Sequence, residues 1–288
     1  MTTLACHARM LPAFLIALTS ALLFIAPSRA DERKILRFAT YATERPSEEL
    51  RKMEPFQKDV ELGLQQRGLA VRVDVRIFPT YGEANQALVA GDVDFVRFGP
   101  ASYVVAKQKN PDLILLAMEG HEGKKHFSGL IVVANASPIR TLADLRGKRI
   151  AFGDPASTTG RYLSQGELVK AGLSAKDFAA YDYLGRHDKV VFAVASGAYD
   201  AGATNERTFE KYAGEKGLRE LTRFPSPTQA WIARSGLDTT TVTALRATLL
   251  SMAGAGLEYI GRNGFRPASD SDFDELRKAM KAAREFSD

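Results

Sequence analysis

A stretch of small and hydroxyl residues, Gly153–Gly160, has the composition of an anion-binding loop. It follows a predicted strand and opens a predicted helix, where backbone N–H groups lack helical partners and the helix dipole favours negative charge. Ser157, Thr158 and Thr159 add three hydroxyl donors, and Gly160 lets the backbone approach a ligand closely. Such a loop can bind an oxyanion without a lysine. An ordinary helix N-cap is the alternative, although one hydroxyl would be enough for that.

The same loop lacks the signals of nucleotide binding and of catalysis. It does not end in the Gly-Lys-Ser/Thr of a P-loop. Ser157 has no activating base nearby in sequence, the nucleophile-elbow pattern is missing, and no paired carboxylates suggest an acid/base couple. We therefore expect a binding protein that is not an enzyme and uses no cofactor.

Histidines provide the second set of candidates. His187 lies between a predicted strand and a predicted helix, where a neutral imidazole could donate a hydrogen bond to an oxyanion. A helix-capping or surface histidine is the alternative. His121 and His126 lie close together in sequence, but their spacing matches no common zinc pattern and no cysteine supports it. We expect no metal site.

Four aromatic residues fall near the ends of predicted strands in the first part of the chain: Tyr41, Tyr81, Phe98 and Tyr103. Aromatic side chains there could wall a cleft and offer phenol groups to a ligand. For each of them, packing in the core is the alternative.

The elements that must position these residues alternate between strand and helix. Hydrophobic periodicity predicts strands at 34–40, 71–78, 94–98 and 113–118, separated by helices at 47–64, 81–90 and 101–107. A second block begins at 130–133 and continues with strands at 148–152, 179–184, 199–203 and 219–223, and with helices at 141–146, 160–170, 187–196 and 205–214. Helices at 239–252 and 271–286 close the chain.

This alternation predicts an α/β fold of open, mostly parallel sheets flanked by helices. No flexible linker separates the two blocks, so we expect two lobes that share crossover strands near Ser128–Asn135 and Leu221–Ala233. Residues 31–130 and 225–288 would form the first lobe and residues 131–224 the second. Ligands of such sheets lie beyond the carboxyl ends of the strands, which places the ligand cleft between the lobes.

Residues 1–30 have the order of a cleavable export signal. Arg9 precedes an apolar run from Leu11 to Ala26, and Ser28 and Ala30 provide the small residues of a cleavage site. A transmembrane anchor is the alternative, but the run is shorter than the ~20 residues that a span needs. Cleavage would leave 258 of the 288 residues and remove the one cysteine, Cys6. We therefore expect a periplasmic protein without disulfides.

The charge of the mature chain suits a small anion better than a nucleic acid. Loss of Arg9 and Arg29 lowers the 39 basic residues to 37, against 34 acidic ones, so the net charge is about +3. No stretch contains five like charges in a row. A chain of this length can bury a core large enough to be stable without disulfides.

Several segments together resemble the phosphate/phosphite/phosphonate-binding family of ABC-transporter solute-binding proteins, over nearly the whole mature chain. They are Val93–Asp94 with Gly99–Tyr103, Ser137–Ile139, Leu142–Lys148, Gly153–Gly160, His187–Asp188, Asp200–Ala203 and Trp231–Arg234. The resemblance implies a two-lobed type II periplasmic binding protein that closes over its ligand by a hinge motion. It also implies that Ser157, Thr158 and Thr159 hold the ligand oxygens, with His187 and Tyr81 as further contacts.

Departures from the family pattern bear on the ligand. A position that is often tyrosine in the family falls on His126. The acidic positions that hold the amine of aminoalkylphosphonates fall on Arg207 and Gln229, which argues against 2-aminoethylphosphonate. Phosphite, methylphosphonate, phosphate or a carboxylated phosphonate fits better. Arsenite-binding relatives depend on a cleft cysteine that the mature chain lacks.

The resemblance leaves two functions open. A transport receptor would deliver the oxyanion to an ABC permease in the inner membrane, whereas a sensor would present its closed form to a histidine kinase. In either case we expect a monomer that binds a small phosphorus oxyanion.

Overall fold

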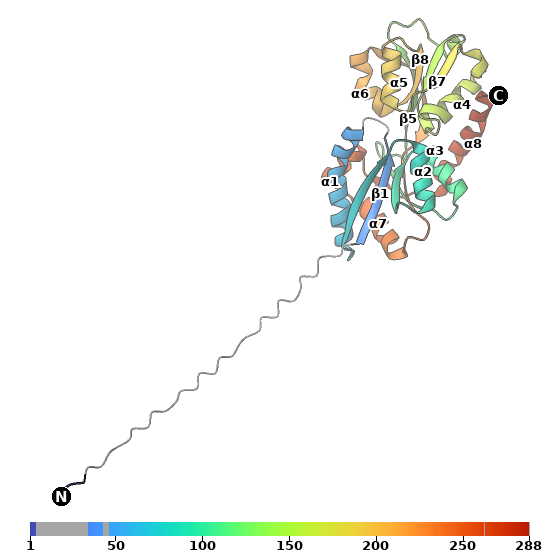
Figure 1. Cartoon of the computed structure of the whole chain (residues 1–288). Coiled ribbons are helices and arrows are strands. Elements are labelled where there is room, and N and C mark those ends of the chain that lie inside the picture. Colours follow the sequence, from blue (N-terminus) through green and yellow to red (C-terminus); the bar gives the residue numbers. More distant parts are fainter. Residues whose placement is uncertain (4–33, 43–45, 262, 288) are drawn as a thin grey trace. The chain divides into compact units, whose positions relative to one another are not determined.

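The computed structural model describes residues 1–3, 34–42, 46–261 and 263–287. Apart from its first three residues, the predicted export signal lies outside the described residues. No helix in the described ranges is both long and apolar enough to cross a membrane. Residues from Lys34 onward form two lobes, each built on its own β-sheet (Figure 1).

The first lobe contains a six-stranded sheet in the order β11-β4-β10-β3-β1-β2. Its strands are β1 (Lys34–Tyr41), β2 (Val71–Phe78), β3 (Phe95–Phe98), β4 (Ile114–Glu119), β10 (Ala230–Ala233) and β11 (Phe265–Arg266). The helices of this lobe are α1 (Pro46–Gln65), α2 (Tyr81–Ala90), α3 (Pro100–Lys109), α7 (Thr239–Ser251) and the short η4 (Gly254–Ile260).

The second lobe contains a five-stranded sheet in the order β7-β6-β8-β5-β9. Its strands are β5 (His126–Ala134), β6 (Arg149–Phe152), β7 (Ala180–Tyr183), β8 (Ala201–Asn205) and β9 (Leu218–Pro227). Its helices are η1 (Leu142–Leu145), η2 (Thr158–Tyr162), α4 (Leu163–Lys170), η3 (Ala175–Asp177), α5 (His187–Ala195) and α6 (Glu206–Lys216). The chain ends with η5 (Asp270–Phe273), α8 (Asp274–Ala282) and η6 (Ala283–Phe286).

Both sheets are mixed, which corrects the expectation of mostly parallel sheets. Strand β1 pairs in parallel with β2 and β3, and β6 pairs in parallel with β7 and β8. The antiparallel pairs involve β10, β5 and their neighbours. The antiparallel pairs arise where the chain crosses between the lobes. Strand β4 leads out of the first lobe and β10 returns beside it in the opposite direction. Strand β5 leads into the second lobe and β9 leaves beside it in the opposite direction.

The crossings lie at residues 120–125 and 228–229, between β4 and β5 and between β9 and β10. The second falls within the predicted range Leu221–Ala233, but the first comes earlier than the predicted Ser128–Asn135. The early residues of β5 explain the difference: His126 is exposed and Phe127 and Ser128 are only half-buried. The continuous apolar run that indicated the strand therefore starts several residues after the strand itself.

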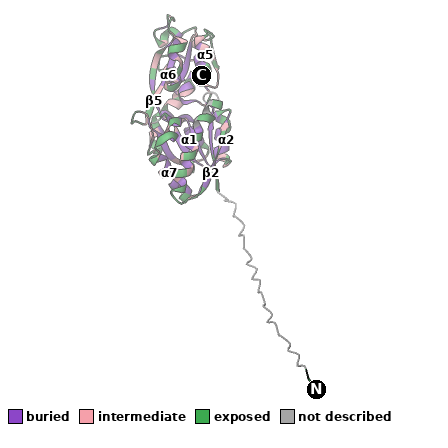
Figure 2. Ribbon diagram, turned by 90° about the vertical axis from the view of Figure 1, so that its left-hand side faces the viewer, coloured by how far each residue is buried: buried purple, intermediate pink, exposed green. Residues whose placement is uncertain are grey.

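Hydrophobic core residues come from the strands of both sheets and from the helices that cover them, and buried residues run through both lobes in Figure 2. In α1, Met53, Phe56, Val60 and Leu64 face the sheet and are at most 1% exposed. Their spacing of three or four residues is the helical periodicity that predicted this helix. Leu50, which the same periodicity included, is instead 51% exposed.

The C-terminal segment packs against the second lobe, although residues 225–288 were expected in the first. Helix α8 and η6 lie against α4, and α8 extends towards α4 in Figure 1. The ring of Phe286 lies 5.5 Å from that of Phe152 and 5.6 Å from that of Tyr181. Phe273, just before α8, packs on Tyr103 of the first lobe. The segment therefore joins both lobes.

This arrangement predicts a large effect for Phe286→Ala. Phe286 is fully buried, and truncating a buried phenylalanine costs about 3–5 kcal/mol. Equilibrium unfolding in urea would measure the loss. Leu62→Ala is the control, because Leu62 is 53% exposed and should change the unfolding free energy by less than about 0.5 kcal/mol. Equal stability of the two variants would contradict the packing of the C-terminal segment on the second lobe.

Candidate ligand-binding site

Five helices begin at one cavity of about 260 Å³, which both lobes line. Each of these helices closely follows a strand, so that its start lies at the carboxyl end of a sheet. Their first residues all line the cavity: Tyr81 of α2, Pro100 of α3, Thr158 of η2, His187 of α5 and Glu206 of α6. Helix starts carry unpaired N–H groups and the positive end of the helix dipole. The fold therefore surrounds the cavity with partial positive charge.

The hydroxyl loop lies at this cavity. Ser157, Thr158 and Thr159 are each at most 5% exposed, and all three line it. Ser157 is the N-cap of η2, and its Oγ accepts the Gly160 N–H at 3.0 Å. The cap and the anion cradle were alternatives in the sequence, but the cap uses only one of the three hydroxyls and so does not exclude the cradle.

Three hydroxyl groups of the cavity each accept a hydrogen bond from a backbone amide, and that of Tyr41 also lies 3.3 Å from the Oγ of Ser102, where either oxygen can donate. The Oγ of Ser157 accepts the Gly160 N–H, the Oγ1 of Thr158 accepts the Ala101 N–H at 2.9 Å, and the hydroxyl of Tyr41 accepts the Gly99 N–H. A backbone amide can only donate, so each hydroxyl keeps its own proton for another partner. Donors that converge on a cavity suit an anion.

Tyr41 keeps its proton at any physiological pH. Burial raises the pKa of Tyr41 to about 12, against the opposing effect of its hydrogen bonds with Ser102 and Gly99. Its ring stacks on that of Tyr81 with the centroids 3.6 Å apart. Both tyrosines line the cavity.

Gly160 has a different role from the one predicted. Its N–H is engaged by Ser157, and its carbonyl oxygen accepts the Gly153 N–H at 2.8 Å. A Cβ atom at Gly160 would lie 2.9 Å from Ser157 Oγ and 3.1 Å from His187 Cε1. Gly160 does not line the cavity. Its missing side chain allows the loop to pack on His187, whereas close approach of the backbone to a ligand was expected.

His187 begins α5 and lines the cavity with only 4% exposure. The N-cap of α5 is Arg186, so the reading of His187 as a surface or capping histidine does not describe its position. Arg186 forms an ion pair with Asp188, with 3.0 Å between Nε and Oδ1. His187 therefore lies in sequence between the two partners of this ion pair.

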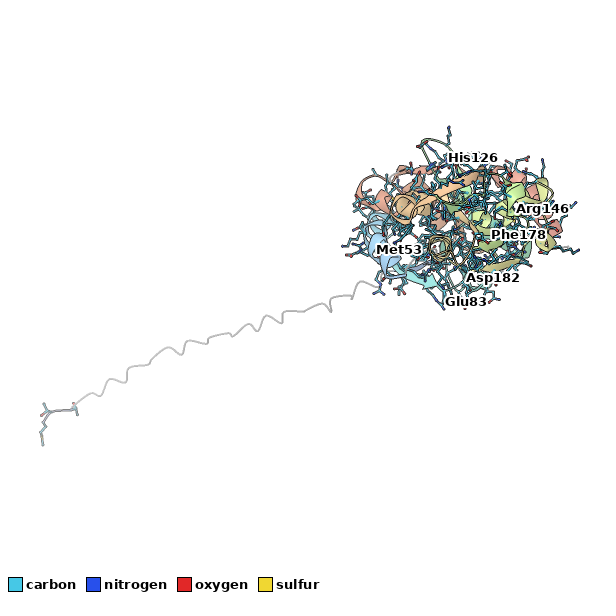
Figure 3. The ribbon with its side chains drawn as sticks, turned by 90° about the horizontal axis from the view of Figure 1, so that it is seen from above. Met53, Glu83, His126, Arg146, Phe178 and Asp182 are labelled. Atoms are coloured by element: carbon cyan, nitrogen blue, oxygen red, sulfur yellow. The ribbon has the colours of Figure 1, made fainter. Side chains whose placement is uncertain are left out.

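Besides Gly160, three candidates lie away from the cavity lining. Phe98 is fully buried and packs behind Tyr41 with 5.4 Å between the ring centroids. His126 is exposed at the first residue of β5, opposite Pro227 of β9 (Figure 3). Tyr103, for which core packing was the alternative, is buried and donates a hydrogen bond to Asp270. These placements do not support cleft contacts for Phe98 or His126.

A buried ion pair of the cavity was missed in the sequence. Arg97 of β3 donates to Glu119 at the end of β4, with 2.9 Å between Nη2 and Oε2, and both line the cavity. Glu119 also accepts the indole N–H of Trp231 at 3.0 Å. A signal existed, since Arg97 is a lone charge within the apolar strand Phe95–Phe98. Buried charges of this kind are usually paired.

Carboxylates also line the cavity beside Arg207 and Gln229. Glu206 and Glu210 of α6 belong to the lining. Glu206 forms an ion pair with Arg223 and lies 3.3 Å from the Nε2 of His121, whereas Glu210 is exposed. Arg207 and Gln229 therefore do not exclude an aminoalkylphosphonate, because carboxylates that could hold its amine lie on the same lining.

The fold and this cavity define a two-lobed solute-binding protein of the type II periplasmic class. The structure of PhnD1 from Prochlorococcus marinus in complex with methylphosphonate has the same fold, with a TM-score of 0.76 at 23% identity over 88% of this chain and 99% of that one. A phosphonate ABC transporter binding protein from Pseudomonas aeruginosa also gives a TM-score of 0.76, at 20% identity over 88% of this chain and 87% of that one.

The family model described as the periplasmic substrate-binding protein of a phosphonate ABC transporter matches residues 38–273. The chain belongs to this family. The phosphonates-binding periplasmic protein of Escherichia coli is 28% identical over 88% of this chain and 78% of its own length. A probable phosphite-binding protein of Prochlorococcus marinus is 33% identical over 48% of this chain, and the match spans about half of that relative (49%).

The family match confirms the resemblance seen in the sequence. It also confirms that the chain belongs to a family of periplasmic substrate-binding proteins of phosphonate ABC transporters, which are binding proteins and not enzymes.

The tight packing at Gly160 predicts that Gly160→Ala destabilises the protein. The added methyl group would press on Ser157 and His187, and overpacking of this kind costs about 1–3 kcal/mol. Gly214→Ala is the matched control: Gly214 lies in α6 with open space around its Cβ position, and alanine should stabilise the helix by about 0.5–1 kcal/mol. Urea unfolding would measure both. A gain of stability in Gly160→Ala would contradict the account of this glycine.

Proposed function

We propose that the cavity binds a small organophosphonate, or the related anions phosphite and phosphate, through neutral hydrogen-bond donors. Ser157, Thr158, Thr159 and His187 of the second lobe and Tyr41 and Tyr81 of the first would contact the ligand. The observation that carries this proposal is that Ser157 and Thr158 each accept a backbone N–H, so that their own protons remain available as donors at the cavity. The Tyr41 hydroxyl likewise accepts the Gly99 N–H and shares a second hydrogen bond with Ser102.

Neutral donors can hold an anion here because the side chains that supply them are buried. A hydrogen bond to an ionised oxygen is about twice as strong as one between neutral groups. A low local dielectric strengthens it further. The five helix starts add partial positive charge at the cavity.

The size of the cavity favours a ligand larger than a bare oxyanion. A cavity needs a volume of about 10–15 Å³ to hold one water molecule, and this cavity has a volume of about 260 Å³. A phosphonate group at the hydroxyls would leave room for a substituent. Arg207, Gln229 and Glu210 lie on the lining where such a substituent could reach polar partners.

The protein would act as the receptor of the transporter to which its family belongs. It would reach the periplasm by cleavage of residues 1–30, bind its ligand as a monomer and release it to a permease in the inner membrane. The motion that releases a ligand in this fold is an opening of the two lobes about the crossings, here residues 120–125 and 228–229.

A thermal-shift screen tests the ligand class. Ligands that bind only the native state raise the melting temperature according to concentration and affinity. We expect stabilisation by methylphosphonate, phosphonoacetate or 2-aminoethylphosphonate, weaker stabilisation by phosphite and phosphate, and none by ethanesulfonate. Stabilisation by the sulfonate alone would contradict the proposal.

The double variant Ser157→Ala/Thr158→Ala tests the hydroxyl loop. It should weaken phosphonate binding at least tenfold, because each lost hydrogen bond to a charged group is worth about 1.5–3 kcal/mol. Isothermal titration calorimetry with the tightest ligand of the screen would measure the change. Ser196→Ala, an exposed hydroxyl at the end of α5, is the control and should bind normally. Unchanged affinity in the double variant would rule out the loop as the ligand contact.

A further inference from the structure

Helix α3 of the first lobe begins without a cap of its own. Its N-cap residue is Gly99, which has no side chain to accept a hydrogen bond, and its first residue is Pro100. A larger residue could not replace Gly99 freely, because a Cβ atom there would lie 2.8 Å from the Tyr41 hydroxyl. The Ala101 N–H therefore needs an acceptor from elsewhere.

The acceptor comes from the other lobe. The Oγ1 of Thr158, in η2 of the second lobe, accepts the Ala101 N–H at 2.9 Å, and both groups are buried. Helix N-caps ordinarily accept the N–H of the second or third helical residue, and Ala101 is the second residue of α3. Thr158 thus takes the place of the N-cap side chain that Gly99 lacks.

A second contact across the cleft accompanies the first. Asp154 of the second lobe is hydrogen-bonded to the backbone amides of Ala156 and Tyr81. Burial raises the pKa of Asp154, and these two hydrogen bonds oppose the rise. Tyr81 is the first residue of α2 in the first lobe. The loop that carries the cavity hydroxyls therefore faces the starts of both α2 and α3.

We propose that Thr158 is a positioning residue as well as a ligand contact, because its hydroxyl caps α3 across the cleft and stabilises the closed arrangement of the lobes. The hydrogen bond must break when the lobes separate, so it adds to the stability of the closed form alone. The same hydroxyl keeps its own proton, which it can donate to an anion in the cavity. This inference rests on the proposed function for the ligand, but the closure it describes does not depend on a ligand.

Ser157 provides the matched control, because it is adjacent, lines the same cavity and accepts a backbone N–H from its own lobe. If Thr158 served only as a ligand contact, loss of either hydroxyl would leave the lobes of the free protein unchanged. If Thr158 caps α3 across the cleft, only its loss would open them. Thr158→Val removes the hydroxyl at nearly constant shape, and Thr158→Ser restores it.

The distance between the lobes can be measured by pulsed electron–electron double resonance on the full chain. Cys6→Ser removes the one native cysteine, and spin labels attach at Lys58→Cys in α1 and Glu215→Cys in α6. These side chains belong to different lobes and are each 70% exposed. Calorimetry with methylphosphonate on the same variants gives the affinity.

We expect the free parent protein to populate a closed distance, and Thr158→Val to reduce that population about fivefold, which corresponds to ~1 kcal/mol for the loss of one cap. Ser157→Ala and Thr158→Ser should keep the parental distances. Methylphosphonate affinity should fall in both Thr158→Val and Ser157→Ala. Identical distances in Thr158→Val and the parent, or a fully open parent, would overturn the proposal. A parent that binds no methylphosphonate would refute the proposed ligand, whereas the distances without ligand would still decide the role of Thr158.

Discussion

The site depends on backbone N–H groups that donate hydrogen bonds to side-chain hydroxyls. Ser157, Thr158 and Tyr41 each accept one amide, from Gly160, Ala101 and Gly99. Because an amide cannot accept, these hydroxyls keep their own protons, which they can donate to an anion. Two of the three amides, those of Gly99 and Ala101, belong to the start of α3, so the first lobe orients hydroxyls that lie in both lobes.

The rest of the fold holds these groups at the cavity. Five helices start where strands of the two sheets end, and buried cores beneath the sheets fix their directions. Glycines matter where groups must approach closely: Gly99 leaves room for the Tyr41 hydroxyl, and Gly160 leaves room for His187. The C-terminal segment links the lobes at a further place, through Phe273 and Phe286.

Local signals predicted the parts of the site that lie on one segment. The hydroxyls of residues 157–159 and His187 were recognisable because each follows a strand and opens a helix, and the same pattern gave the order of elements. Features that depend on contacts between distant segments were not recognisable. Gly160 contacts His187, Thr158 contacts Ala101, and Glu119 pairs with Arg97 only after the fold brings them together. The first crossing was predicted too late in the chain because the start of β5 is exposed. Glu206 and Glu210 were missed because the family pattern pointed only to Arg207 and Gln229.

A crystal structure of the protein with bound methylphosphonate tests the central claim most directly. The account predicts phosphonate oxygens within about 2.5–2.8 Å of Ser157 Oγ, Thr158 Oγ1 and the Tyr41 hydroxyl, as expected for hydroxyl donors on an ionised oxygen. The backbone amides of Gly160, Ala101 and Gly99 should remain bonded to those same hydroxyls. A phosphonate group held instead by the Arg207 guanidinium, with the three hydroxyls turned to other partners, would contradict it.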